Sequence, residues 1–219
     1  MKQNWRAVLC AVDGTGLDPE DLRLESVLTP LRREELARKI RREDQIRSVC
    51  AELALRGAFR LFGEPFRPYN RGEHGEPLLE DGLFLSFSHT GSWGLAVLAT
   101  CPVGLDCESA ERDLTRVRPR LCAGEEQVPD RELVRLWTAK EAYLKMTGEG
   151  LSFPMTRLVL EEGVLYRDGM EAARIRYPSG PEGMVTALAA PGPVPTITRR
   201  YSAETALAEA LEQIKEQKL

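Results

Sequence analysis

Two carboxylates, Asp106 and Glu108, stand two residues apart in the segment VGLDCE, which follows an apolar run. In an extended strand, residues two apart point to the same face, so the two acids are expected side by side. Adjacent carboxylates repel each other, and a hard divalent cation is the natural group to lie between them. The alternative is a pair of solvated acids at a strand end, which this segment alone leaves open.

A predicted helix over residues 131–146 supplies a third acid, Glu141, with Lys145 one turn later. In this order the two side chains also form a favourable surface ion pair, so the helix by itself does not indicate a site. Together with Asp106 and Glu108, however, the third carboxylate completes an oxygen-rich set suited to Mg²⁺. Lys145 is then placed to face a phosphate or a developing anion.

The periodicity of the chain predicts the elements that position these residues. Predicted strands cover residues 5–12, 83–88, 93–100, 158–165 (with a turn at 161–163), 173–177, 184–189 and 197–201. Predicted helices cover residues 29–62, 131–146 and 202–219. A long loop at 63–81 precedes the Ser88-His89 pair, and long loops in compact domains are often functional.

Composition limits the classes of protein. The chain has 219 residues with 42% hydrophobic and 29% charged side chains, enough for one large domain or two small ones. A net charge of −4 argues against a basic nucleic-acid binder. Five scattered cysteines without a CxxC pair, and only 2 His, argue against structural zinc and favour reduced thiols in the cytoplasm. No stretch is long enough for a membrane span, and the first apolar run is too short for a signal peptide.

Three motifs, Ser88-His89, VGLDCE and WTAKEAYLK, occur in the order seen in the 4′-phosphopantetheinyl transferases of the Sfp type, and the chain resembles that family. The tail GEGLSFP after the helix matches as well. The run REDQIRS at 42–48 resembles the family's helix that touches coenzyme A. The resemblance covers nearly the whole chain.

The resemblance implies an α+β fold of two similar α/β subdomains in one chain, related by pseudo-twofold symmetry, with the active site between them. The expected halves are residues 1–102, with the helix that contacts coenzyme A and the Ser88-His89 motif, and residues 103–219, with the metal site and the WTAKEAYLK helix. We expect a monomer.

The resemblance also implies the reaction, transfer of the phosphopantetheine arm of coenzyme A to a Ser hydroxyl of an acyl or peptidyl carrier protein. Asp106, Glu108 and Glu141 are then expected to bind Mg²⁺. Glu141, directly or through a metal-bound water, is expected to help remove the Ser proton, and Lys145 to stabilise the leaving phosphate. The expected contacts to coenzyme A are Arg32, Ser48, Gly75, Pro77, Ser88, His89, Lys140 and Lys145.

The loop before Ser88 departs from the family pattern. Members often have Gly-Lys-Pro where this chain has Gly75-Glu76-Pro77. Because a carboxylate cannot donate to a phosphate, another cation must supply that contact. His74, Arg71 and Arg67 are the candidates.

The segment RDLTRVRPR is the predicted docking surface for the carrier. It carries four arginines, Arg112, Arg116, Arg118 and Arg120, against one acid. Carriers of this class are typically acidic around the modified Ser, so a local basic surface is expected despite the net charge of −4. Val117 and Leu121 are the predicted apolar centre. The alternative is an exposed basic loop without a partner.

Two other functions were weighed. A hydrolase built on Ser88, His89 and Asp106 is disfavoured, because adjacent strand residues point to opposite faces and no G-x-S-x-G elbow occurs. A non-enzymatic module that binds RNA through the basic helix is disfavoured by the interleaved acids and the negative net charge.

Overall fold

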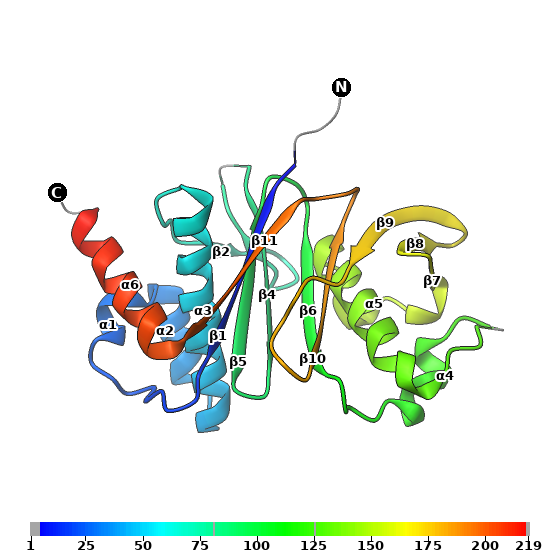
Figure 1. The fold of residues 1–219 in the computed structure, drawn as a ribbon, viewed down its shortest axis with the longest axis horizontal. Helices are drawn as coiled ribbons and strands as arrows, with labels where there is room; N and C mark the ends of the chain where they lie inside the picture. The colour runs from blue at the N-terminus through cyan, green and yellow to red at the C-terminus, as the bar shows by residue number, and fades with distance from the viewer. Residues whose placement is uncertain (1–4, 81, 125, 218–219) are drawn as a thin grey trace.

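The structure is a computed structural model that describes residues 5–80, 82–124 and 126–217. Two sheets meet at the centre of the molecule, and helices lie on either side of them (Figure 1). The helices are α1 (Leu24–Val27), α2 (Pro30–Ala37), α3 (Arg42–Phe62), α4 (Arg118–Leu121), α5 (Leu133–Thr147) and α6 (Ala203–Glu216). The predicted mixed α+β class is confirmed, whereas the pseudo-twofold relation stays a prediction.

The first sheet has four strands in the order β11-β1-β5-β4. Its strands are β1 (Ala7–Asp13), β4 (Phe84–Thr90), β5 (Trp93–Ala99) and β11 (Thr196–Ser202). β11 pairs in parallel with β1, and the other pairs are antiparallel. The C-terminal strand and α6, which packs on α3, therefore lie in the first half, although the predicted division at residue 102 assigns them to the second.

The second sheet has five strands in the order β6-β10-β9-β8-β7, all antiparallel. Its strands are β6 (Gly104–Ser109), β7 (Leu158–Glu161), β8 (Val164–Arg167), β9 (Met170–Arg176) and β10 (Met184–Ala190). A short hairpin of β2 (Asn70–Arg71) and β3 (Pro77–Leu78) forms a separate two-stranded sheet. Within the described residues, no helix is both long and apolar enough for a bilayer span.

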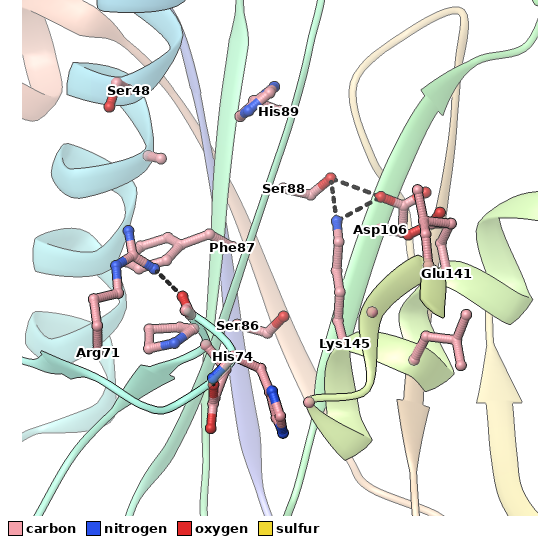
Figure 2. A pocket seen from close by; sticks show the side chains of 18 of the residues that line it. Ser48, Arg71, His74, Ser86, Phe87, Ser88, His89, Asp106, Glu141 and Lys145 are labelled. Carbon is pink, nitrogen blue, oxygen red and sulfur yellow. Dashed lines mark hydrogen bonds and ion pairs between the residues drawn. The ribbon is translucent and has the colours of Figure 1, made fainter. Parts of the chain in front are cut away.

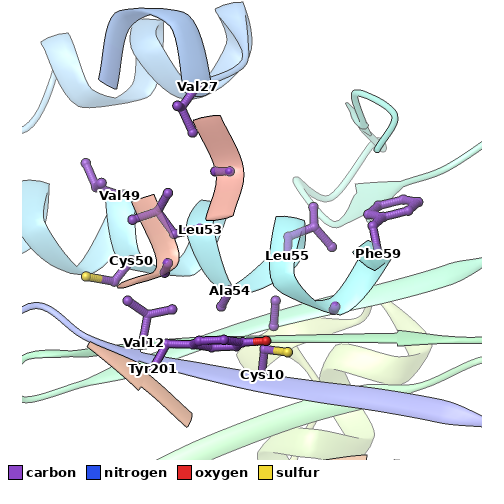
Figure 3. Close-up of a cluster of buried hydrophobic side chains, with 14 of the residues drawn as sticks. Cys10, Val12, Val27, Val49, Cys50, Leu53, Ala54, Leu55, Phe59 and Tyr201 are labelled. Carbon is purple, nitrogen blue, oxygen red and sulfur yellow. The ribbon is translucent and has the colours of Figure 1, made fainter. Parts of the chain in front are cut away.

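β1 is apolar from Ala7 to Val12 because both of its faces are buried. Val8, Cys10 and Val12 face α3, where they pack with Leu53 and other buried residues (Figure 3). Alternate residues such as Leu9 point to the other face and join a core shared with β6 and β10. A strand buried on both faces reads as a continuous apolar run, and here it ties the two sheets together.

One glycine in each half lets a long helix pack directly on a strand. A Cβ atom on Gly94 of β5 would lie 2.3 Å from the Ala51 amide nitrogen of α3. A Cβ atom on Gly104 of β6 would lie 1.8 Å from the Ala142 carbonyl oxygen of α5. Because α5 approaches β6 this closely, side chains of the helix meet those of the strand at the carboxyl-rich segment.

The predicted helix over 29–62 is wrong in one respect, because the structure has two helices there, α2 and α3, with a non-helical link between them. Arg41 is extended, with φ −85° and ψ 129°, so the helix restarts at Arg42. Thr29 caps α2, its side chain accepting from the Arg32 amide, and Pro30 occupies the first turn as predicted. The predicted loop over 63–81 contains the β2–β3 hairpin; residue 81 lies outside the described residues. Residues 218 and 219 of the predicted C-terminal helix also lie outside them.

Candidate functional site

A cavity of about 800 Å³ lies between the two halves and collects residues from nearly all the motifs. One wall is formed by α2, α3, β4 and the β2–β3 hairpin, and the other by β6, α5 and the turn that follows α5. The predicted site residues that line it are Arg32, Ser48, Gly75, Pro77, Ser88, His89, Asp106, Glu108, Glu141 and Lys145. Lys140 does not.

Three carboxylates meet on the β6–α5 wall. Asp106 and Glu108 point to the same side of β6, as their spacing predicts, and Glu141 projects from α5. Burial, together with the neighbouring Asp106 carboxylate, raises the pKa of Glu141 to about 7. Burial also raises the pKa of Glu108, although the Arg112 guanidinium opposes this effect. The charged forms of Glu141 and Glu108 are therefore disfavoured in the absence of a cation.

Lys145 lies among these acids and contacts Asp106 rather than Glu141. Its Nζ is 2.7 Å from Asp106 Oδ1 and 3.4 Å from Ser88 Oγ (Figure 2). The Ser88 hydroxyl also donates to Asp106 Oδ1 at 3.0 Å. The Lys145 ammonium therefore already neutralises one oxygen of Asp106. The alternative, in which Lys145 pairs with Glu141 on the helix surface, is not what the structure shows.

The donor set of this wall fits a hard cation. All three acids offer oxygen ligands, and Asp106 Oδ2 is buried with no hydrogen-bond partner in the described part of the chain. The described residues nevertheless contain no group of three His, Cys, Asp or Glu already spaced to hold a metal ion. Glu108 pairs with Arg112, and Asp106 pairs with Lys145. A bound cation would have to take over these pairings.

The opposite wall is basic, and two of its arginines, Arg32 and Arg71, are paired with acids. Arg32 is only 5% exposed, and its Nε lies 3.2 Å from Oε2 of Glu52, an acid buried in α3. Arg32 Nη1 donates to Glu35 and to Ser48, each at 2.9 Å. Glu35 also pairs with Arg71. Arg32 Nη2 is buried without a partner among the described residues and is left to donate to an anion in the cavity.

The β2–β3 hairpin brings its loop to the same wall. Arg71 Nη1 donates to the Gly75 carbonyl at 3.0 Å and holds the loop (Figure 2). The Glu76 carboxylate accepts from the His74 amide at 3.0 Å and lies near the end of α5. Arg71 and His74 line the cavity, so two of the three candidates to replace the missing Lys are in place; Arg67 does not line it.

Lys140 is the predicted site residue that the fold does not bring to the cavity. Its side chain is completely buried, and Nζ donates to the Leu121 carbonyl at 2.7 Å and to Glu126 at 3.2 Å. The structure therefore does not place Lys140 for the predicted contact with coenzyme A. Position 140 lies next to Glu141 on α5, and a helix turns about 100° per residue, so the two side chains leave different faces.

Comparison with known proteins finds similarity to one family. Residues 102–166 match the model of the 4′-phosphopantetheinyl transferase superfamily. The chain is 24% identical over 165 residues to the 4′-phosphopantetheinyl transferase Sfp of Bacillus subtilis (strain 168), covering 68% of this chain and 72% of that protein. It is 26% identical over 113 residues to the 4′-phosphopantetheinyl transferase psf-1 of Bacillus pumilus, covering 47% of each. The resemblance to Sfp-type 4′-phosphopantetheinyl transferases is confirmed.

The segment that matches the superfamily model contains β6 and α5. All three carboxylates and Lys145 of the acidic wall therefore lie inside the segment that matches the superfamily model. The basic wall lies outside that segment.

Sequence reasoning missed several residues of the site. Arg38 and Lys39 line the cavity and form no ion pair with any described residue. They belong to a charged run that is typical of a solvated helix face, and they follow α2 at the point where the helix ends. Glu52 and Ser86 were missed because both lie among apolar neighbours. A charged or hydroxyl side chain on an otherwise apolar face was the available signal.

Proposed function

We propose that the protein transfers the 4′-phosphopantetheine arm of coenzyme A to a serine of an acyl or peptidyl carrier protein. The single observation that carries this proposal is the cavity itself, with three carboxylates and Lys145 on one wall and a set of arginines on the other. A nucleotide with several phosphates, and a reaction at its pyrophosphate, need both kinds of wall. The resemblance to Sfp-type transferases supports the same reaction.

In the proposed reaction the carrier Ser oxygen attacks the phosphorus nearer the pantetheine arm. The bond from that phosphorus to the bridging oxygen breaks, and adenosine 3′,5′-bisphosphate leaves. Glu141 is the proposed acceptor of the Ser proton, because its carboxylate lines the cavity beside Asp106 and Lys145. Lys145 stabilises the negative charge on the leaving phosphate.

Asp106, Glu108 and Glu141 are the proposed holders of Mg²⁺. Support comes from the orphaned Asp106 Oδ2 and from the all-oxygen donor set. When bound, Mg²⁺ supplies charge neutralisation beside the pyrophosphate. The side chains of the wall then have separate tasks: the acids fix the position of the pyrophosphate, and Lys145 exchanges its contact with Asp106 for one with the substrate.

The basic wall is the proposed site for the nucleotide end of coenzyme A. Arg32 Nη2, Arg38 and Lys39 have unused donors for phosphate oxygens. Ser88 and His89 are the proposed contacts from β4. Partial desolvation and the nearby Arg47 and Lys145 charges lower the pKa of His89, so its imidazole is neutral at neutral pH before a ligand binds. Gly75 and Pro77 contribute backbone and ring surface from the hairpin.

The division into two related halves, at 1–102 and 103–219, remains part of the proposal. Its support is the shared device of a glycine under a long helix, Gly94 beneath α3 and Gly104 beneath α5. β11 and α6 are exceptions to a simple division, because they pack on the first half. A monomeric state and a cytoplasmic location are likewise proposed.

The alternatives are less well supported. For a hydrolase with His89 as the base, the Ser88 hydroxyl would have to donate to His89. It donates to Asp106 instead, and Ser88 is buried whereas His89 is exposed. For an RNA-binding module, the helix arginines would have to be free, but Arg42 and Arg47 pair with Asp18 and Asp44.

The deciding experiment is to incubate the protein with coenzyme A, Mg²⁺ and an apo carrier protein and to weigh the carrier by mass spectrometry. A gain of one phosphopantetheine arm on the carrier supports the transferase. A panel of apo carriers from fatty-acid, polyketide and peptide synthesis identifies the preferred class. If no carrier of the panel gains mass while a known transferase modifies all of them, the proposal fails.

A further inference from the structure

The two sheets meet along β4 and β6, and no backbone ladder joins these strands. β4 is the edge of the first sheet and β6 the edge of the second, and the strands that the structure describes pair them only with β5 and β10. They nevertheless lie side by side (Figure 1). The amides of β6 that face β4 therefore need partners of another kind, because buried N–H groups are rarely left unpaired.

Two serine hydroxyls supply those partners. The Leu105 amide donates to Ser86 Oγ at 3.1 Å, and the Cys107 amide donates to Ser88 Oγ at 3.0 Å. Ser86 and Ser88 are two apart on one strand, as are Leu105 and Cys107 on the other. The spacing of both sets is the period of a strand, so the hydroxyls act as a ladder made of side chains.

This ladder is buried and encloses the central acid of the site. Ser86 is 3% exposed and Ser88 is 4% exposed, and the two amides that they accept from belong to buried residues. Asp106 lies between those amides and points to the cavity. The backbone is therefore fixed on both sides of the residue whose carboxylate contacts Lys145 and Ser88.

We propose that Ser86 and Ser88 form a hydroxyl seam that sets the register of the two halves and thereby positions Asp106. Ser86 is a positioning residue, since its hydroxyl accepts from Leu105 and acts on Asp106 only through the β6 backbone. Ser88 has a second task, because its hydroxyl also donates to Asp106. The inference rests on the proposed function only in its predicted effect on turnover; the hydrogen bonds of the seam do not depend on it.

Ser86→Ala tests the seam without removing any contact to Asp106. It leaves the Leu105 amide without a partner, so this amide is expected to exchange with deuterium at least about tenfold faster, the scale of one lost hydrogen bond. Turnover is expected to fall about tenfold as Asp106 loses its position, while KM for coenzyme A changes less than about threefold. Ser86→Thr keeps the hydroxyl and is expected to restore both exchange and turnover.

Thr186→Val is the matched control. Thr186 is 3% exposed on β10, the other neighbour of β6, and its hydroxyl donates to Cys107 Sγ rather than accepting from an amide. This variant removes a buried hydroxyl that, like that of Ser86, contacts β6. The rate of deuterium exchange at the Leu105 amide and the turnover are therefore expected to stay near the wild-type values.

Several outcomes overturn the seam. Unchanged exchange at Leu105 in Ser86→Ala contradicts it, as does a raised KM for coenzyme A with unchanged turnover, which would make Ser86 a substrate contact. If Ser86→Ala does not fold, wild-type exchange decides: Leu105 and Cys107 amides as fast as those of an open edge strand exclude the seam. Because exchange needs no substrate, this readout stands even if the transfer reaction is not observed.

Discussion

The two walls of the cavity differ in how their charged side chains are paired. On the basic wall, Arg32 is held by Glu52 and Glu35, and Arg71 by Glu35, so these two arginines are paired before any ligand binds. On the acidic wall, Glu108 and Glu141 have raised pKa values because burial and a neighbouring acid oppose their charge. The buried arginine of the basic wall is therefore paired with acids, whereas Glu141 on the acidic wall has no cation paired with it in the described residues.

This difference separates recognition from chemistry. A wall whose arginines are fixed by buried acids presents a rigid surface, which suits the binding of a nucleotide that stays the same through the reaction. A wall of mutually repelling acids around one lysine responds strongly to an added cation or to a change in substrate charge. We therefore expect changes to the acidic wall to affect turnover most and changes elsewhere to affect stability or binding.

The largest effect is expected from Asp106→Ala or Glu141→Ala. Either variant should abolish transfer, because the Mg²⁺ set loses a ligand, while the metal-free protein keeps its fold since one repelling acid has been removed. Mass analysis of the carrier measures transfer, and thermal unfolding with and without Mg²⁺ measures binding. Mg²⁺ should raise the melting temperature of the wild type only.

Full activity in either variant, or an equal thermal shift by Mg²⁺ in variant and wild type, would remove the metal assignment from these residues. Loss of transfer together with loss of the fold would instead make the acid structural.

The acidic wall could be predicted from the sequence better than the basic wall, because sequence periodicity reveals only some of the features that form a wall. The strand period places Asp106 and Glu108 on one face, and the helix period adds Glu141 and Lys145, so the acidic wall was predictable. The basic wall depends on the break after α2 and on Glu52, a buried acid whose partners lie elsewhere in the chain. Periodicity tells which face a residue occupies but not what packs against that face, and for the same reason the return of β11 to β1 was not predicted.

The next effect concerns Lys145. If it stabilises the leaving phosphate, Lys145→Ala should lower turnover by roughly a hundredfold, the scale of losing one charge-stabilising donor. The wild-type ion pair with Asp106 is partly exposed, so the stability change should stay small by comparison. Lys215→Ala, which removes an exposed lysine from α6, is the matched control for the loss of one positive charge. Near-normal turnover in Lys145→Ala would limit Lys145 to pairing with Asp106.

A smaller effect, on stability alone, is expected at Lys140. Lys140→Met removes the donor to the Leu121 carbonyl and leaves Glu126, a mostly buried carboxylate at 14% exposure, without its ion pair. The free energy of unfolding should fall by about 2 kcal/mol, less than for a fully buried pair. Denaturant unfolding measures it, and KM for coenzyme A should not change. A raised KM with unchanged stability would return Lys140 to the cavity.

The smallest effect is expected at the basic segment after β6, the proposed docking surface for the carrier. Arg112 pairs with Glu108, and Arg118 donates to the Val128 carbonyl at 2.6 Å and pairs with Asp130, so both are tied to the protein. Leu121 is fully buried and so is not available for the predicted apolar centre, whereas Val117 is half-buried. Arg116 and Arg120 remain exposed, with no ion pair to any described residue.

Arg116→Glu combined with Arg120→Glu should therefore raise KM for an acidic carrier by roughly fivefold and leave KM for coenzyme A nearly unchanged, because rim charges act through association with their own partner. Added salt should weaken carrier binding by the wild type more than by the double variant, since screening removes what the variant has already lost. Arg199→Glu with Arg200→Glu, on β11 away from the cavity lining, makes the same change in charge and should not alter carrier KM. Equal effects of the two double variants would show that net charge alone, and not this segment, attracts the carrier.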